Sequence, residues 1–110
     1  INVGAIDNST TEQKVYFSET GPRVDVYAPG TMIMGAYVND SYVTDAVPDP
    51  RNGQYYLNKI SGTSQATPQV TGIISCILQV RPTMTNTNVV NFLKATSFKN
   101  IIVRTILVSM

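Results

Sequence analysis

The segment GTSQATPQVTG, residues 62–72, decides the fold of this chain. It brings Ser64 to the point where an amphipathic helix is predicted to begin. The N–H groups of a first helical turn lack main-chain acceptors, and the helix dipole favours negative charge there. A hydroxyl in that position suits a nucleophile whose reaction passes through an oxyanion. A serine before an apolar run is also a common N-cap, so the triplet 62–64 alone does not specify catalysis.

The spacing of apolar residues predicts two helices. The first runs from about residue 64 to residue 80 and has five large aliphatic residues at helical spacing: Val70, Ile73, Ile74, Ile77 and Leu78. We expect it to be a largely buried central helix, with Pro68 tolerated in its first turn and Cys76 as a small buried packing residue. The second runs from about residue 86 to residue 95, with Thr85 as its N-cap.

Short extended segments are predicted before the first helix, from apolar and β-branched runs. They are expected at residues 1–6, 15–17, 24–27 and 32–38. Residues 39–58 are polar and contain the turn-like run VPDPRNG, which predicts a long loop of the functional or mobile kind. Within it, residues 55–57 could pair as a short strand.

Three longer segments of the sequence resemble segments of a known protein family. Residues 62–72 closely resemble the nucleophile motif of the subtilisin-like serine proteases, Gly-Thr-Ser-x-Ala-x-Pro-x-Val-x-Gly, and Ser64 stands where that family has its nucleophile. The block FSETGPRVDVYAPG, residues 17–30, is similar to the family segment Phe-Ser-x-x-Gly-Pro-x-x-Asp-Val-x-Ala-Pro-Gly. Residues 3–7, VGAID, are similar to the family strand before it. The family usually has a histidine, which is not the catalytic one, where this chain has Gln69.

The resemblance covers residues 1–97 and implies the C-terminal part of a subtilisin-like catalytic domain. The implied fold is α/β, with three layers, a mostly parallel sheet and helices on both faces. We expect Ser64 at the carboxyl edge of the sheet, where such folds hold their active sites. Residues 98–110 lack the family's glycine-rich closing segment. The β-prone run at 101–108 predicts a divergent tail that docks as a strand or pairs with another chain.

The resemblance implies peptide-bond hydrolysis through an acyl-enzyme on Ser64, whose own N–H would be one oxyanion-hole donor. The family also uses an Asp, a His and an oxyanion-hole Asn, and this chain contains no histidine. Removing the base of such a triad costs on the order of a millionfold in turnover, so the isolated chain is expected to be inactive. The three missing residues are expected from a segment upstream of Ile1, as in a processed chain, or from an associated chain. The alternative is a non-catalytic structural or assembly protein built on a subtilisin-like remnant.

Composition and charge restrict the partners. The chain is 43% hydrophobic and 14% charged, which fits a piece that buries faces against a neighbour. All seven acidic residues lie in residues 1–49, while residues 50–110 hold six basic residues and no acid. Those basic residues are scattered, which favours an ordinary solvated surface over nucleic-acid binding. We expect a peptide substrate, with the N-terminal segment of the same precursor or a larger assembly as partner. We expect no nucleic acid and no membrane, and the cellular location stays open.

Asp25 is a candidate cation ligand. In some relatives the matching aspartate helps to bind a cation, together with carbonyl groups from other segments. Calcium takes about six to eight oxygen ligands, so one carboxylate does not make a site. The competing interpretation is a strand aspartate that is hydrogen-bonded to nearby backbone. No cofactor is needed for the chemistry, and this chain alone does not support a structural calcium ion.

Overall fold

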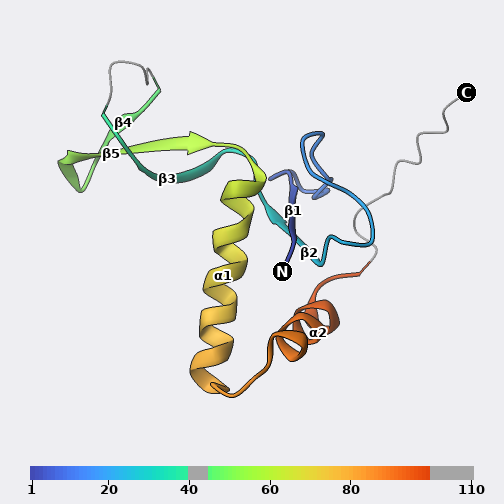
Figure 1. Ribbon diagram of the computed structural model, residues 1–110. Helices are drawn as coiled ribbons and strands as arrows, with labels where there is room; N and C mark the ends of the chain where they lie inside the picture. Colours follow the sequence, from blue (N-terminus) through green and yellow to red (C-terminus); the bar gives the residue numbers. More distant parts are fainter. Residues whose placement is uncertain (40–44, 100–110) are drawn as a thin grey trace, which may run out of the picture.

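A computed structural model describes residues 1–39 and 45–99. The elements in chain order are β1 (Val3–Ile6), β2 (Val26–Pro29), β3 (Ile33–Tyr37), β4 (Val47–Asp49), β5 (Asn52–Ile60), α1 (Thr63–Val80) and α2 (Asn86–Thr96). The strands β1 and β2 lie beside the two helices, while β3, β4 and β5 form an arm that projects from the start of α1 (Figure 1). The α/β fold class is confirmed. The tail predicted to be β-prone, at 101–108, lies outside the described residues.

The strands β1 and β2 are parallel, with Val3 opposite Val26 and Ala5 opposite Ala28. The connection between them returns to β1 without forming a strand, so the strand predicted at 15–17 was wrong. The connection pairs with β1 only through an isolated antiparallel bridge between Ile6 and Lys14 in the described residues. Further along, the hydroxyl of Ser18 accepts the N–H of Ala5 at 2.8 Å. A side chain takes the place of the main-chain acceptor that a neighbouring strand would supply.

The arm is an antiparallel sheet in the order β3-β5-β4. It corrects the loop predicted at 39–58, because β4 and most of β5 lie in that range; residues 40–44 are outside the described residues. The proline-rich run makes the tight turn between these two strands. Asp49 closes that turn by accepting the backbone N–H of Arg51 at 2.9 Å and pairing with its guanidinium at 2.6 Å. The short strand expected at 55–57 is confirmed as part of the longer β5.

The buried core joins the parallel pair to both helices. Its members are Ala5, Val26, Ala28, Ala66, Val70, Val89 and Leu93. Three of the seven are alanines, which let α1 approach the strands closely, and Ala5 and Ala66 are fully buried. The first turns of α1 are therefore held against the middle of β1 and β2.

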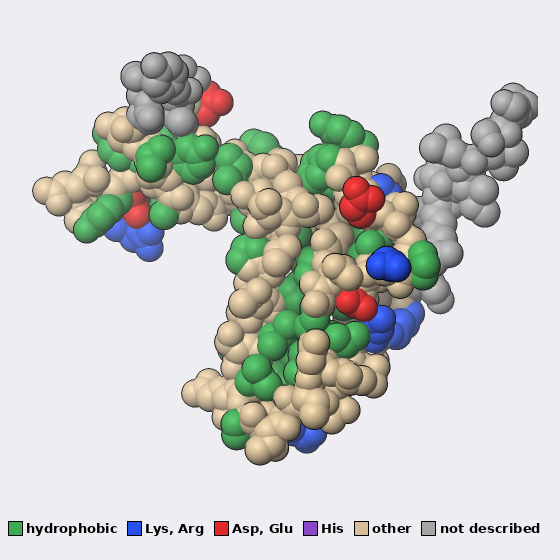
Figure 2. Space-filling view, viewed as in Figure 1, with side chains coloured by type: hydrophobic (Ala, Val, Ile, Leu, Met, Phe, Trp, Pro, Cys, Tyr) green, Lys and Arg blue, Asp and Glu red, His purple; other side chains and the backbone are tan. Residues whose placement is uncertain are grey.

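Helix α1 forms where it was predicted, but it is not largely buried. Its buried residues are Ala66 and Val70 alone, while the side chains of Ile73 and Val80 are 54% and 79% exposed. Cys76 is exposed too, which corrects its expected burial. Figure 2 shows hydrophobic side chains at the surface over the part of the body formed by the two helices. Helical spacing groups apolar residues on one face, but another segment must cover that face to bury it.

Helix α2 confirms the second prediction. The hydroxyl of Thr85 caps it by accepting the N–H of Asn88 at 3.3 Å, as expected of an N-cap threonine. In the described part of the chain, neither helix combines the length and the hydropathy that crossing a membrane requires.

Candidate active site

Ser64 is the second residue of α1 and is exposed. Gly62 precedes the helix with φ 159°, a conformation that residues with a side chain rarely adopt. Among the described residues, neither the hydroxyl nor the N–H of Ser64 has a hydrogen-bond partner. An exposed hydroxyl thus lies beside an unpaired helix N–H, the arrangement that can present a nucleophile and an oxyanion donor together.

Pro68 lies deeper in α1 than predicted. It is the sixth residue of the helix, so it belongs to the second turn and not to the first. A residue there would normally donate its N–H to the carbonyl of Ser64, four residues earlier. Proline has no N–H to donate, and its ring crowds that carbonyl. The turn that carries Ser64 therefore lacks one of its main-chain hydrogen bonds.

Two hydrogen bonds attach this turn to the carboxyl end of β2. The N–H of Gly62 donates to the carbonyl of Gly30 at 2.7 Å. The side-chain amide of Gln69 donates to the carbonyl of Pro29 at 2.7 Å and to that of Gln65 at 2.9 Å. The two attachments bracket Ser64 in sequence. Ser64 therefore lies at the carboxyl end of the parallel pair, as expected.

Gly30 permits this close approach. A Cβ at position 30 would lie 2.6 Å from the Cβ of Ala5 and 2.8 Å from the carbonyl oxygen of Gly62. Real Cβ atoms essentially never come this close to other heavy atoms. Only a residue without a side chain lets β2, β1 and the start of α1 meet at one point.

Ser61 attaches the arm to the same region. Its hydroxyl accepts the N–H of Met32 at 2.8 Å, and Met32 has the left-handed φ of 53°. This contact joins the start of β3 to the residue before Gly62. Sequence reasoning missed Ser61, since a serine next to a glycine carries no signal of such a contact. In the sequence, Gln69 stands out only because the family usually has a histidine at this position.

Both carboxylate oxygens of Asp25 have a donor. One carboxylate oxygen accepts the backbone N–H of Asn2 at 2.9 Å, and the other pairs with the ammonium of Lys94 at 2.9 Å. The hydrogen bond from the Asn2 N–H is the main reason that the pKa of Asp25 is below its usual value, and Lys94 lowers it further. Asp25 is hydrogen-bonded to nearby backbone, as the competing interpretation expected, although it lies just before β2 and not within it. The described residues contain no group of three or more His, Cys, Asp and Glu side chains that could hold a metal ion.

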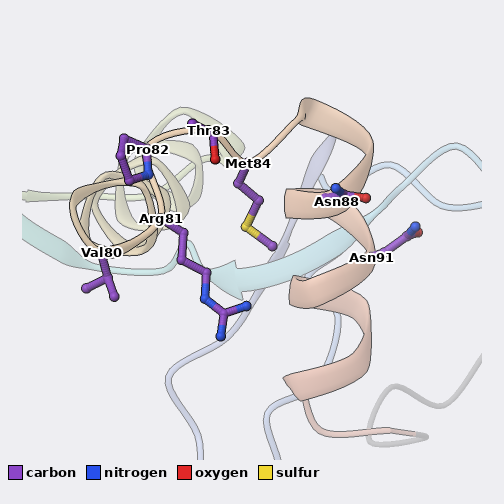
Figure 3. Close-up of a pocket in the computed structure, with 7 residues that line it drawn as sticks. All are labelled: Val80, Arg81, Pro82, Thr83, Met84, Asn88 and Asn91. Atoms are coloured by element: carbon purple, nitrogen blue, oxygen red, sulfur yellow. The ribbon is translucent and has the colours of Figure 1, made fainter.

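A hollow of about 650 Å³ lies where α1 leads into α2. Its lining residues are Val80, Arg81, Pro82, Thr83, Met84, Asn88 and Asn91. Arg81 and Met84 extend toward the space between the helices (Figure 3). The hollow is at the opposite end of α1 from Ser64 and has no carboxylate or imidazole in its lining (Figure 1). It is therefore a poor candidate for acid–base chemistry.

Comparison with known proteins connects this geometry to a family. The model of the Subtilase family matches residues 1–107. Serine protease AprX of Bacillus subtilis is 36% identical over 105 residues, which cover 86% of this chain and 24% of that protein. An extracellular serine proteinase of a Thermus species is 35% identical over 102 residues, covering 93% of this chain and 21% of that protein.

A solved structure has the same fold. It is the crystal structure of a cold adapted subtilisin-like serine proteinase, which superposes with a TM-score of 0.68 at 25% sequence identity. The superposition covers 94% of this chain and 32% of that one. The chain thus spans about a quarter or less of the named protein relatives and about a third of the solved structure.

Proposed function

Because the chain belongs to the subtilase family, we propose that it carries the nucleophile of a serine endopeptidase. The observation that carries this proposal is the exposed Ser64 at the start of α1, with its N–H unpaired among the described residues. The hydroxyl of Ser64 would attack the carbonyl carbon of a peptide bond while a base removes its proton. The N–H of Ser64 would donate to the oxyanion that forms.

The later steps form an acyl-enzyme and then regenerate the free hydroxyl of Ser64. Collapse of the tetrahedral intermediate expels the amine, which takes up the proton, and leaves an ester on Ser64. Water then attacks the ester, releases the acid and regenerates the serine. We propose peptides as the substrate class.

The base must come from elsewhere, because the chain has no histidine. We propose that an N-terminal segment of the same precursor, or a chain associated with this one, supplies the His, the Asp and the oxyanion-hole Asn. Exposed apolar residues support such a partner. Ile73, Val80 and Phe92 are between 40% and 79% exposed, and they line one apolar hollow formed by α1 and α2. A partner that covers them would remove this apolar surface from water.

A serine-directed fluorophosphonate probe tests the activity. The chain assembled with the proposed segment should be labelled at Ser64, and S64A should abolish the labelling. S75A is the matched control, because Ser75 is an exposed serine of the same helix whose hydroxyl donates to the carbonyl of Thr71. Failure of the assembled protein to react, while a known serine protease does, would contradict the proposal.

Expression of residues 1–110 alone tests the partner. We expect an aggregated or loosely packed product that the additional segment converts to a soluble one. A soluble monomer that unfolds cooperatively without the segment would contradict a stable association. The two tests are independent, since a partner could stabilise the fold without completing a catalytic site.

Because the chain has no histidine, a second candidate function is a non-catalytic structural or assembly protein built on the same fold. That candidate predicts a stable assembly in which Ser64 does not react with the probe. The endopeptidase candidate predicts reaction in the assembly and none in the isolated chain. The labelling experiment therefore separates the two.

A further inference from the structure

We propose that Gln69 is a positioning residue that holds the turn carrying Ser64 against the carboxyl end of β2. The inference rests on the proposed function of Ser64 as a nucleophile. Gln69 does not touch the reacting atoms. It acts through the main chain on either side of them.

The contacts of the side-chain amide carry the inference. Its nitrogen donates to two carbonyl groups, that of Pro29 at 2.7 Å and that of Gln65 at 2.9 Å. The first lies 40 residues away at the end of β2, and the second belongs to the residue after Ser64. One planar amide group therefore fixes the distance between the strand end and the reactive turn.

The turn needs such a support because Pro68 removes a hydrogen bond from it. The carbonyl of Ser64 has no N–H donor at position 68, so the helix itself restrains this turn less than an uninterrupted helix would. The other hydrogen bond between this turn and the end of β2 runs from Gly62 to Gly30, on the N-terminal side of Ser64. Gln69 supplies the attachment on the C-terminal side. Without it, the packing of Ala66 would remain, but no hydrogen bond would hold the C-terminal side of the turn to β2.

Misplacement is expected to slow the chemical step and to spare substrate binding. A displacement of about 1 Å at a reacting centre can cost about 100-fold in rate. We expect Q69M, which keeps the length of the side chain and loses the donor, to lower kcat by about 10- to 100-fold with KM changed less than about threefold. Q69H should recover part of the loss, since an imidazole N–H can still donate to one of the two carbonyls.

Q79M is the matched control. Gln79 is an exposed residue of the same helix, and its side chain has no hydrogen-bond partner among the described residues. The experiment uses the protein assembled with the segment that supplies the base, and active-site titration corrects each variant for the folded fraction. A kcat for Q69M equal to that of Q79M would overturn the positioning role while leaving the endopeptidase proposal intact.

Hydrogen exchange separates failure of this inference from failure of the proposed function. Exchange of the hydrogen-bonded N–H groups of Gly62 and Gln65 should accelerate about tenfold or more in Q69M and stay unchanged in Q79M. This measurement needs no activity, so it tests the attachment even if Ser64 proves unreactive. Equal exchange in the two variants would show that the amide contacts do not restrain the turn, and would overturn the inference.

Discussion

Replacing Gly30 with alanine measures how tightly the strand end and the helix start are packed. The new Cβ would lie 2.6 Å from the Cβ of Ala5 and 2.8 Å from the carbonyl oxygen of Gly62. Ala5 is fully buried, and Gly62 is tied to Gly30 by its own hydrogen bond, so relieving the clash requires a shift in the packed core or the loss of that bond. Gly30 does not have a positive φ, so alanine can adopt its backbone conformation and the cost is steric.

The magnitude follows from two contributions. Adding a carbon to a packed site typically costs about 1–3 kcal/mol. The hydrogen bond from Gly62 to Gly30 must lengthen, which forfeits much of its net worth of about 0.5–1.5 kcal/mol. We expect G30A to lower the free energy of unfolding by about 2–4 kcal/mol. Because Gly62 is two residues before Ser64, labelling of Ser64 by a fluorophosphonate should slow as well.

Urea unfolding of the assembled protein, followed by circular dichroism, measures the change in stability. The control is G35A on β3, where a Cβ would meet nothing within 4 Å. It should leave the free energy of unfolding unchanged or raise it by up to about 1 kcal/mol, and it should not lower it. If G30A is as stable as G35A and labels at the normal rate, the close approach at Gly30 imposes no constraint and the reasoning fails.

Three further substitutions test local features of the chain. G72A should raise the free energy of unfolding by about 0.4–1 kcal/mol, since Gly72 lies inside α1 with open space around it, and an unchanged urea midpoint would contradict this. T85A should lower it by about 1 kcal/mol through loss of the α2 cap, and should reduce helix content by circular dichroism. Asp49 has a pKa of about 2 because Arg51 hydrogen-bonds to it through its side chain and its N–H. At pH values above the ordinary aspartate pKa of about 4, that interaction stabilises the fold. The stabilisation is lost as the pH falls from about 4 to about 2. In R51M, NMR titration should show the pKa of Asp49 rising toward its ordinary value, and no rise would exclude the side chain as the main cause.

Local patterns predicted the helices and the position of Ser64. Helix α1 follows from apolar spacing and α2 from spacing plus the Thr85 cap, and both signals act over one or two turns of chain. The strands were harder to predict. Residues 15–17 have a β-prone composition and form no strand; Val15 donates its N–H to Ala5, but the N–H of Ala5 bonds to the Ser18 hydroxyl and not to a main-chain carbonyl.

In the arm, the strand prediction failed in the opposite way, because residues predicted to be a loop form strands. Residues 39–58 have the composition of a loop, yet β4 and β5 pair within and beyond that range. The turn residues Pro50 and Arg51 were correctly interpreted as a turn. What the composition did not indicate was that the polar residues on either side of the turn would find strand partners in each other and in β3.

The sequence by itself determined the family, the extent of both helices and the presence of a serine at the start of the first, because motifs and helical periodicity are properties of neighbouring residues. Only the tertiary structure decided what covers each face and which distant groups meet. It left Cys76 and Ile73 exposed, and it joined Gln69 to Pro29 across 40 residues of chain. Periodicity says which side chains share a face, whereas burial and long-range hydrogen bonds depend on where the rest of the chain is packed.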